Sequence, residues 1–75
     1  MLGNELRKAR EEAGLSQEQV SFSAGIDRSY ISLLENNKKS PTVELLIRLC
    51  DALGVSAADL LARVETTRKP KAKKK

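Results

Sequence analysis

Residues 14–37 read GLSQEQVSFSAGIDRSYISLLENN, and this stretch decides the fold. Ser16 is followed three residues later by Gln19, a capping box in which each side chain satisfies a backbone N–H of the other residue. This pair predicts the start of a short helix. Gly25 predicts its end, because glycine readily adopts the left-handed conformation that follows many helices.

A second short helix is expected directly after the first. Asp27 is its candidate cap, and the helix should run to about Asn36. Asn37 is a candidate left-handed terminator, because asparagine tolerates positive φ better than most residues. Two short helices joined by a tight turn can place the second in the major groove of DNA, although many helical hairpins with a glycine turn bind nothing.

The flanking sequence predicts three more helices and no strand. Apolar residues at spacings of three and four indicate a helix over 3–13, which Gly14 ends. Thr42 caps a helix over 43–53 that is apolar almost all round, which is typical of a buried central helix. Ser56 starts a fifth helix that ends near Val64. The expected fold is all-α, a compact five-helix domain containing a helix-turn-helix.

Charge divides the 75-residue chain into a domain at 1–65 and a tail at 66–75. The net charge is +4, but the first segment holds eight basic and ten acidic residues, whereas the second holds six basic residues and no acidic one. Such a tail cannot bury apolar surface, so we expect disorder there. It could support DNA binding without reading sequence, bind another anionic partner, or serve only solubility.

Several functional classes are excluded by composition. Cys50 is the single cysteine and histidine is absent, so the sequence predicts no disulfide, no metal site and no cofactor. A nucleophile–base pair and a glycine-rich phosphate loop are also missing, so no enzyme is expected. No apolar run approaches the roughly 20 residues of a membrane span, and no signal peptide is apparent. We expect a cytoplasmic, nucleoid-associated protein of a prokaryote, phage or plasmid, without a small-molecule ligand.

Many residues across the chain recur in a known pattern. They are Leu6-Arg7, Ala9-Arg10, Gly14-Leu15-Ser16-Gln17-Glu18, Val20, Ala24-Gly25-Ile26-Asp27-Arg28-Ser29-Tyr30-Ile31-Ser32, Leu34-Glu35-Asn36, Pro41-Thr42, Leu45-Leu46, Leu49, Ala52-Leu53-Gly54-Val55-Ser56 and Asp59-Leu60-Leu61. This set, over about residues 4–62, resembles the phage-repressor/Cro (XRE) helix-turn-helix family. The resemblance implies a lambda-repressor-like domain whose third helix reads DNA. Family members mostly bind operators as dimers and regulate transcription.

Candidate DNA-binding residues follow from this resemblance and from side-chain chemistry. They are Gln17, Arg28, Ser29, Tyr30, Ser32, Leu33, Asn36, Asn37, Lys38 and Lys39. At the start of the reading helix, Arg28 can donate two hydrogen bonds to a guanine, or can contact a phosphate instead. The family pattern places Gln17 against a phosphate, where a helix N-terminus favours negative charge. The backbone amides of the two asparagines and the ammonium groups of Lys38 and Lys39 suit phosphate oxygens.

Two of these residues have balanced alternatives. Family members often have a polar residue where this chain has Leu33, which either touches a thymine methyl or is a solvent-exposed leucine without a role. The resemblance suggests that the Tyr30 hydroxyl reaches a phosphate, while the alternative is a core aromatic ring with a solvated hydroxyl.

Other residues are expected to act through structure and assembly. The family pattern pairs Arg10 with Glu35, which would fix how the reading helix sits. Ala57, Leu61 and Val64 recur at i, i+4 and i+7 and could form a self-complementary dimer stripe. The alternative is that Leu60 and Leu61 merely close the core.

The function expected from the sequence is regulation of transcription at a palindromic or nearly palindromic operator. The third helix would enter the major groove of double-stranded DNA, and the protein would be a homodimer. A restriction-modification controller and a phage or plasmid repressor are the leading versions. The alternative is an antitoxin or adaptor whose main ligand is a partner protein.

Overall fold

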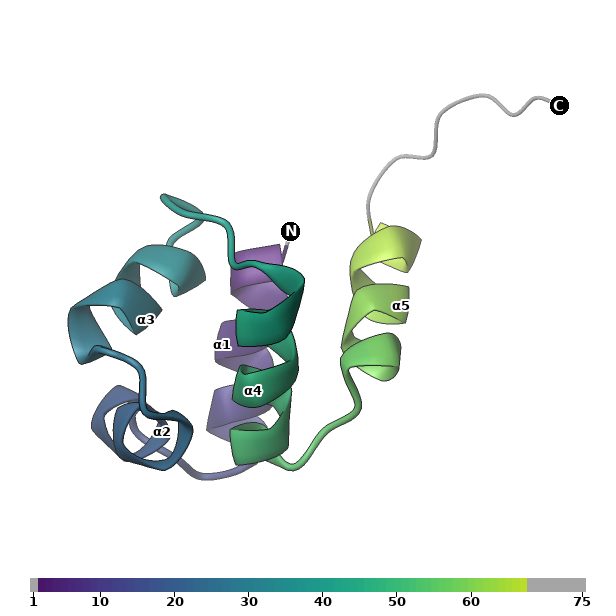
Figure 1. The fold of residues 1–75 in the computed structure, drawn as a ribbon. Coiled ribbons are helices and arrows are strands. Elements are labelled where there is room, and N and C mark those ends of the chain that lie inside the picture. Colours follow the sequence, from purple (N-terminus) through teal and green to yellow (C-terminus); the bar gives the residue numbers. More distant parts are fainter. Residues whose placement is uncertain (1, 68–75) are drawn as a thin grey trace, which may run out of the picture.

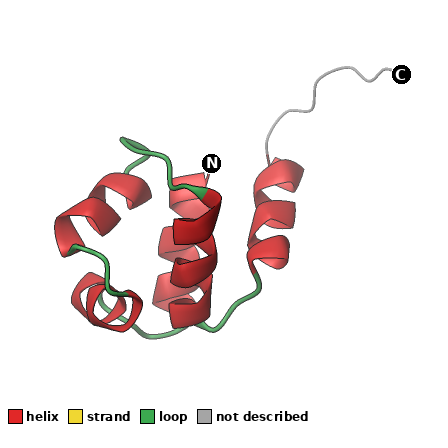
Figure 2. Ribbon diagram, viewed as in Figure 1, coloured by secondary structure: helices red, strands yellow, loops and turns green. Residues whose placement is uncertain are grey.

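The computed structural model describes residues 2–67, which form five α-helices and no strand (Figure 2). The helices are α1 (Leu2–Glu12), α2 (Gln17–Ala24), α3 (Arg28–Glu35), α4 (Val43–Leu53) and α5 (Ala57–Thr67). The all-α class and the helix-turn-helix at α2–α3 are thus confirmed. Residues 68–75 of the predicted basic tail lie outside the described residues.

The start and end of α2 follow the sequence signals. The Ser16 hydroxyl accepts a hydrogen bond from the Gln19 N–H at 3.0 Å, and the Gln19 side chain accepts one from the Ser16 N–H at 2.8 Å. Gly25 follows the helix with φ 68°, in the left-handed region. Because these bonds satisfy helix-end groups locally, the capping box was sufficient to predict where α2 begins.

The end of α3 is a complete Schellman motif. Asn37 has φ 61°, and its N–H donates to the Leu34 carbonyl at 3.1 Å. The Lys38 N–H donates to the Leu33 carbonyl at 2.8 Å, which closes the longer of the two bonds of this motif. The start of α3 differs from the prediction, because Asp27 occupies the cap position but its carboxylate accepts no capping hydrogen bond.

Helices α1 and α4 form the middle of the molecule, with α2 and α3 at one end and α5 at the other (Figure 1). The packed pairs include α1 with α3, α2 with α3 and α4, and α5 with α1 and α4. The core contains at least one residue from every helix: Leu6, Ala9, Val20, Ala24, Ile26, Ile31, Leu34, Leu46, Leu49, Cys50, Leu53 and Leu60. Burial of this apolar surface is the main force that assembles the short helices.

Two expectations about α4 and α5 need correction. Helix α4 is not buried all round, since Val43 is 73% exposed and Ile47 is 48% exposed. Its neighbours cover the side that carries the buried Leu46 and Leu49. Val43 and Ile47 are four residues apart and therefore share a different side of the helix, which is exposed. Helix α5 continues to Thr67, three residues beyond the end expected near Val64.

Candidate nucleic-acid interface

One face of α3 is buried against the domain and the other faces the solvent. Ile31, Leu34 and Glu35 point inward and are buried. Arg28 and Ser29 are exposed, Ser32 is half-buried and Leu33 is 38% exposed, so these four form an outward face. Arg28 makes no ion pair within residues 2–67, and its guanidinium is therefore available to a ligand.

A surface hollow brings this face together with the first turn of α2. Its volume is about 340 Å³, and its lining consists of Gln17, Arg28, Ser29, Ser32 and Leu33. These five residues come from both helices of the motif and were all candidates from the sequence. The hollow thus combines an arginine, an amide, two hydroxyls and one apolar side chain, which are groups that contact phosphates and base edges.

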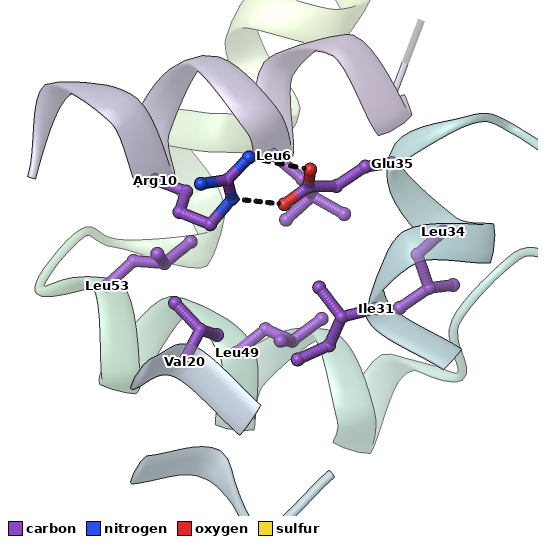
Figure 3. A pocket seen from close by; sticks show the side chains of 8 residues that line it. All are labelled: Leu6, Arg10, Val20, Ile31, Leu34, Glu35, Leu49 and Leu53. Carbon is purple, nitrogen blue, oxygen red and sulfur yellow. Dashed lines mark hydrogen bonds and ion pairs between the residues drawn. The ribbon is translucent and has the colours of Figure 1, made fainter. Parts of the chain in front are cut away.

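Behind the hollow, the buried carboxylate of Glu35 fixes α3 to the rest of the domain. Arg10 donates to it twice, from Nε to Oε2 at 2.7 Å and from Nη2 to Oε1 at 3.0 Å (Figure 3). The third donor is Gln17, whose Nε2 lies 3.0 Å from Oε1. The bidentate geometry is directional as well as strong, so it sets the rotation of α3 about its own axis.

The hydrogen bonds of Arg10 stabilise its charged form. Arg10 also donates from Nη1 to the Leu15 carbonyl at 2.9 Å. Its hydrogen bond to Glu35 raises the pKa of the guanidinium further above its ordinary value, although partial burial opposes that shift. In Figure 3, apolar side chains lie beside the pair and line, together with it, a void of about 10 Å³. Such a void has room for at most one water molecule.

Gln17 has one amide hydrogen to spare. One N–H of its side chain is used by Glu35, but an amide nitrogen carries two hydrogens. The second hydrogen can reach a ligand in the hollow, which Gln17 also lines. Its position therefore allows it to hold α3 and contact a phosphate at the same time.

The four residues after α3 divide into two kinds. Asn36 and Asn37 use their side-chain amides within the protein: Asn36 donates to the Ser32 carbonyl at 2.9 Å, and Asn37 accepts from the Gly3 N–H at 2.9 Å. Lys38 and Lys39 are exposed and form no ion pair within residues 2–67. The lysines are therefore the free cations of this loop. The backbone N–H groups of Asn36 and Asn37, which were expected to suit phosphate oxygens, donate instead to the carbonyls of Ser32 and Leu34.

The remaining candidates lie in mixed surroundings. Tyr30 is half-buried, with its ring packed against the core. Of the three residues of the α5 stripe, Leu61 is 43% exposed, whereas Ala57 and Val64 are half-buried. The stripe thus offers one clearly exposed apolar side chain to a partner.

Sequence reasoning missed three residues at this site, all from α1. Arg7 donates to the Asn36 side chain at 3.1 Å and lies 3.7 Å from Glu35, while Gly3 and Asn4 bond to Asn37. No local pattern points to these contacts, because each joins residues about 30 positions apart.

Two kinds of feature are absent from residues 2–67. No helix in this range combines the length and the apolar character that crossing a bilayer requires. Groups of three or more potential metal ligands are absent from the same range.

The family pattern described as "Helix-turn-helix" matches residues 6–60, which is more than half of the chain. This protein belongs to the helix-turn-helix family of DNA-binding transcriptional regulators. The match includes the hollow, the Glu35 network and all of α2, α3 and α4.

Relatives with similar lengths support this assignment. The chain is 37% identical over 67 residues to the uncharacterized HTH-type transcriptional regulator y4dJ of Sinorhizobium fredii, covering 89% of this chain and 87% of the relative. It is 34% identical to the control protein C.MunI of a Mycoplasma species, with 84% and 86% covered. Among solved structures, SinR, a master regulator for biofilm formation, superposes with a TM-score of 0.77 at 32% identity, with 81% and 98% covered, and was crystallised in complex with DNA.

Proposed function

We propose that this protein is a sequence-specific regulator of transcription that binds a palindromic or nearly palindromic operator with α3 in the major groove. The observation that carries the proposal is the division of α3 into a fixed inner face and a free outer face. Glu35 fixes the inner face through Arg10 and Gln17, while the side chains of Arg28, Ser29 and Leu33 form no hydrogen bond or ion pair within residues 2–67. A helix that is held firmly and presents free donors is suited to reading base edges.

Each residue of the hollow has a chemical role in this proposal. Arg28 donates two hydrogen bonds to the O6 and N7 atoms of a guanine, which discriminates by about 1–3 kcal/mol against other bases. Ser29 and Ser32 exchange single hydrogen bonds with base edges, and Leu33 contacts a thymine methyl. Gln17 donates its second amide hydrogen to a phosphate beside the N-terminus of α2.

Lys38 and Lys39 contact phosphates beyond the C-terminal end of α3, and the Tyr30 hydroxyl contacts a phosphate from the first turn of the helix. These contacts carry no sequence information, but they fix the register of α3 on the duplex. They also make binding sensitive to salt, because each neutralised phosphate releases counterions.

We infer a homodimer in which α5 meets its copy, with Leu61 at the centre of the contact. Val43 and Ile47 are exposed apolar residues of α4, which packs against α5, and they are further surface that a partner could bury. A twofold contact of this kind would place two copies of α3 about one helical turn of DNA apart. Sedimentation equilibrium tests it: Leu61→Glu should shift the protein to monomer, whereas Phe22→Glu, on the 91% exposed Phe22 of α2, should not.

Selection of bound fragments from a random duplex library, at physiological salt, tests DNA recognition. We expect a near-palindrome with half-sites about 10 base pairs apart. In a follow-up, Arg28→Ala should lower affinity for that operator by at least tenfold more than for unrelated duplex, and the control Arg48→Ala should lower both equally. Equal losses for Arg28→Ala would reduce Arg28 to a phosphate contact. Binding without any enriched sequence would refute the operator and favour the adaptor alternative.

A further inference from the structure

We propose that the first turn of α1 is a positioning element for DNA binding. In this inference, which rests on the proposed function, Asn37 is a positioning residue. It joins Gly3 to the end of α3 and thereby fixes the loop that presents Lys38 and Lys39 to phosphates.

The first step is an unusual cap for α1. The first N–H groups of a helix have no partner inside the helix. Here the Gly3 N–H donates to the Asn37 side chain at 2.9 Å, and the Asn37 amide donates back to the Asn4 side chain at 3.1 Å. The capping residue thus lies 34 positions later in the chain, at the end of the reading helix.

The second step is a backbone approach that only glycine permits. A Cβ atom at Gly3 would lie 2.4 Å from the Leu34 carbonyl oxygen, 2.8 Å from the Glu35 carbonyl oxygen and 2.6 Å from the Asn37 side chain. Two of these three atoms belong to the backbone of α3 and cannot rotate away. Any other residue at this position would therefore push α1 and the end of α3 apart, even though glycine is a poor helix former.

The contacts of Asn37 with Gly3 and Asn4 form what we call the clasp, and the third step links this clasp to the lysines. The same Asn37 that caps α1 takes the left-handed conformation that ends α3, so it sets the direction in which the chain leaves the helix. Lys38 is the next residue, and its N–H completes the Schellman motif with Leu33. A second tie, from Arg7 to the Asn36 side chain at 3.1 Å, holds the preceding residue to α1.

The alternative is that the clasp only stabilises the fold and does not position Lys38. A double-mutant cycle distinguishes these two roles. If the clasp positions Lys38, a protein without the clasp should lose most of the contribution that Lys38 makes to DNA affinity. Asn37→Gly deletes the side-chain cap but permits the observed φ of 61°. Asn37→Asp keeps an acceptor for the Gly3 N–H and is the conservative control. Asn4→Ala removes one exposed hydrogen bond of the clasp. It should lower DNA affinity, but by less than Asn37→Gly does.

The experiment measures the affinity of the full chain for the selected operator and for a random-sequence duplex at several salt concentrations. In the wild-type background, Lys38→Ala should lower affinity several-fold for both duplexes and make the slope of log K against log salt less negative by about 0.9. In the Asn37→Gly background, Lys38→Ala should change affinity less than twofold and leave the slope unchanged. In the Asn37→Asp background its effect should equal that in the wild type. Circular dichroism at the binding temperature checks that each variant is folded.

Additive losses from Asn37→Gly and Lys38→Ala would overturn the inference, because the two residues would then act independently. Gly3→Ala gives a second test: we expect at least a tenfold loss of operator affinity. A Gly3→Ala protein that is more stable and binds DNA normally, as helix propensity alone predicts, would also overturn it. A wild-type chain that binds neither duplex would refute the proposed function itself, whereas additivity in a chain that binds both refutes only the clasp.

Discussion

Helices α3 and α5 both pack against α1, but they are held there in different ways. The buried carboxylate of Glu35, 3% exposed, receives three hydrogen bonds from Arg10 and Gln17 and thereby holds α3. Helix α5 is anchored by one fully buried side chain, Leu60, and by Arg63, whose side chain is 41% exposed.

The ion pairs of Arg63 are long compared with those of Arg10. Arg63 lies 3.5 Å from Glu5 and 3.8 Å from Glu12, and the buried Oε1 atom of Glu5 has no hydrogen-bond partner within residues 2–67. Directional bonds thus set the orientation of α3, whereas apolar contact and solvent-screened charges hold α5. The difference fits the proposed roles of the two helices. Helix α3 would be ordered before it binds DNA, whereas α5 would gain further contacts from a second copy of the protein.

The largest effect is expected from Glu35→Ala, which breaks the attachment of α3. It leaves the partly buried Arg10 without its counterion, and we expect a loss of about 4 kcal/mol in the free energy of unfolding. Urea titration followed by circular dichroism measures it. Glu65→Ala, at an exposed position on α5, is the control and should change stability by less than about 0.5 kcal/mol. A loss below about 1 kcal/mol in Glu35→Ala would show that the network does not determine how α3 is held.

Leu60→Ala should weaken the attachment of α5 by about 3 kcal/mol, since it leaves a cavity where the buried side chain packs. Hydrogen exchange resolved by segment should show the greatest loss of protection in α5 and little in α3. The neighbouring Leu61→Ala, measured at high dilution, is the matched control and should be nearly silent in the monomer. Equal deprotection of α3 and α5 would contradict the difference between the two helices.

Arg63→Gln tests the screened charges and should cost at most about 1 kcal/mol, because the side chain is 41% exposed. The difference from wild type should shrink as sodium chloride is added, since salt screens exposed ion pairs. Stability of both proteins is compared by thermal melting at low and high salt. A large, salt-independent loss would mean that Arg63 compensates the buried Glu5 charge as strongly as Arg10 compensates Glu35.

The smallest expected effect on stability comes from the thiol of Cys50, on the central helix α4. It can be tested on the wild-type protein. Burial, with a smaller contribution from Asp51, raises the pKa of its thiol above the ordinary value of 9.0. The folded state thus favours the protonated thiol, so this contribution to stability is present below about pH 9 and is lost as pH rises through the folded pKa. A thiol reagent at pH 8 should label the native protein far more slowly than the urea-unfolded one. If the native and unfolded proteins were labelled equally fast, the buried side of α4 would be open to solvent although α2 and α5 pack against it.

Local signals explain which parts of the fold could be predicted. The caps at Ser16, Gly25 and Thr42 involve partners within four residues, so the sequence contains both halves of each interaction. The outward residues of α3 could also be named, because a short helix with Ile31 and Leu34 inward has only one other face.

Contacts between distant segments explain what could not be predicted. The exposed face of α4 depends on which neighbours cover it, and the Asn37–Gly3 bond depends on how α1 and α3 pack. The position of Asn37 after α3 predicts a contact with DNA, but it gives no sign that the Asn37 side chain accepts a hydrogen bond from a backbone N–H of α1.

The free outer face of α3 has a consequence for how such a regulator can change. Arg28, Ser29 and Leu33 contribute almost nothing to the folding energy, since none of them is buried. Surface positions of this kind usually tolerate replacement within about 0.5 kcal/mol. If α3 reads the operator as proposed, one or two substitutions could give new operator preferences and leave the scaffold intact. Duplicated copies of this gene could diverge to serve separate promoters without first acquiring compensating changes in the core.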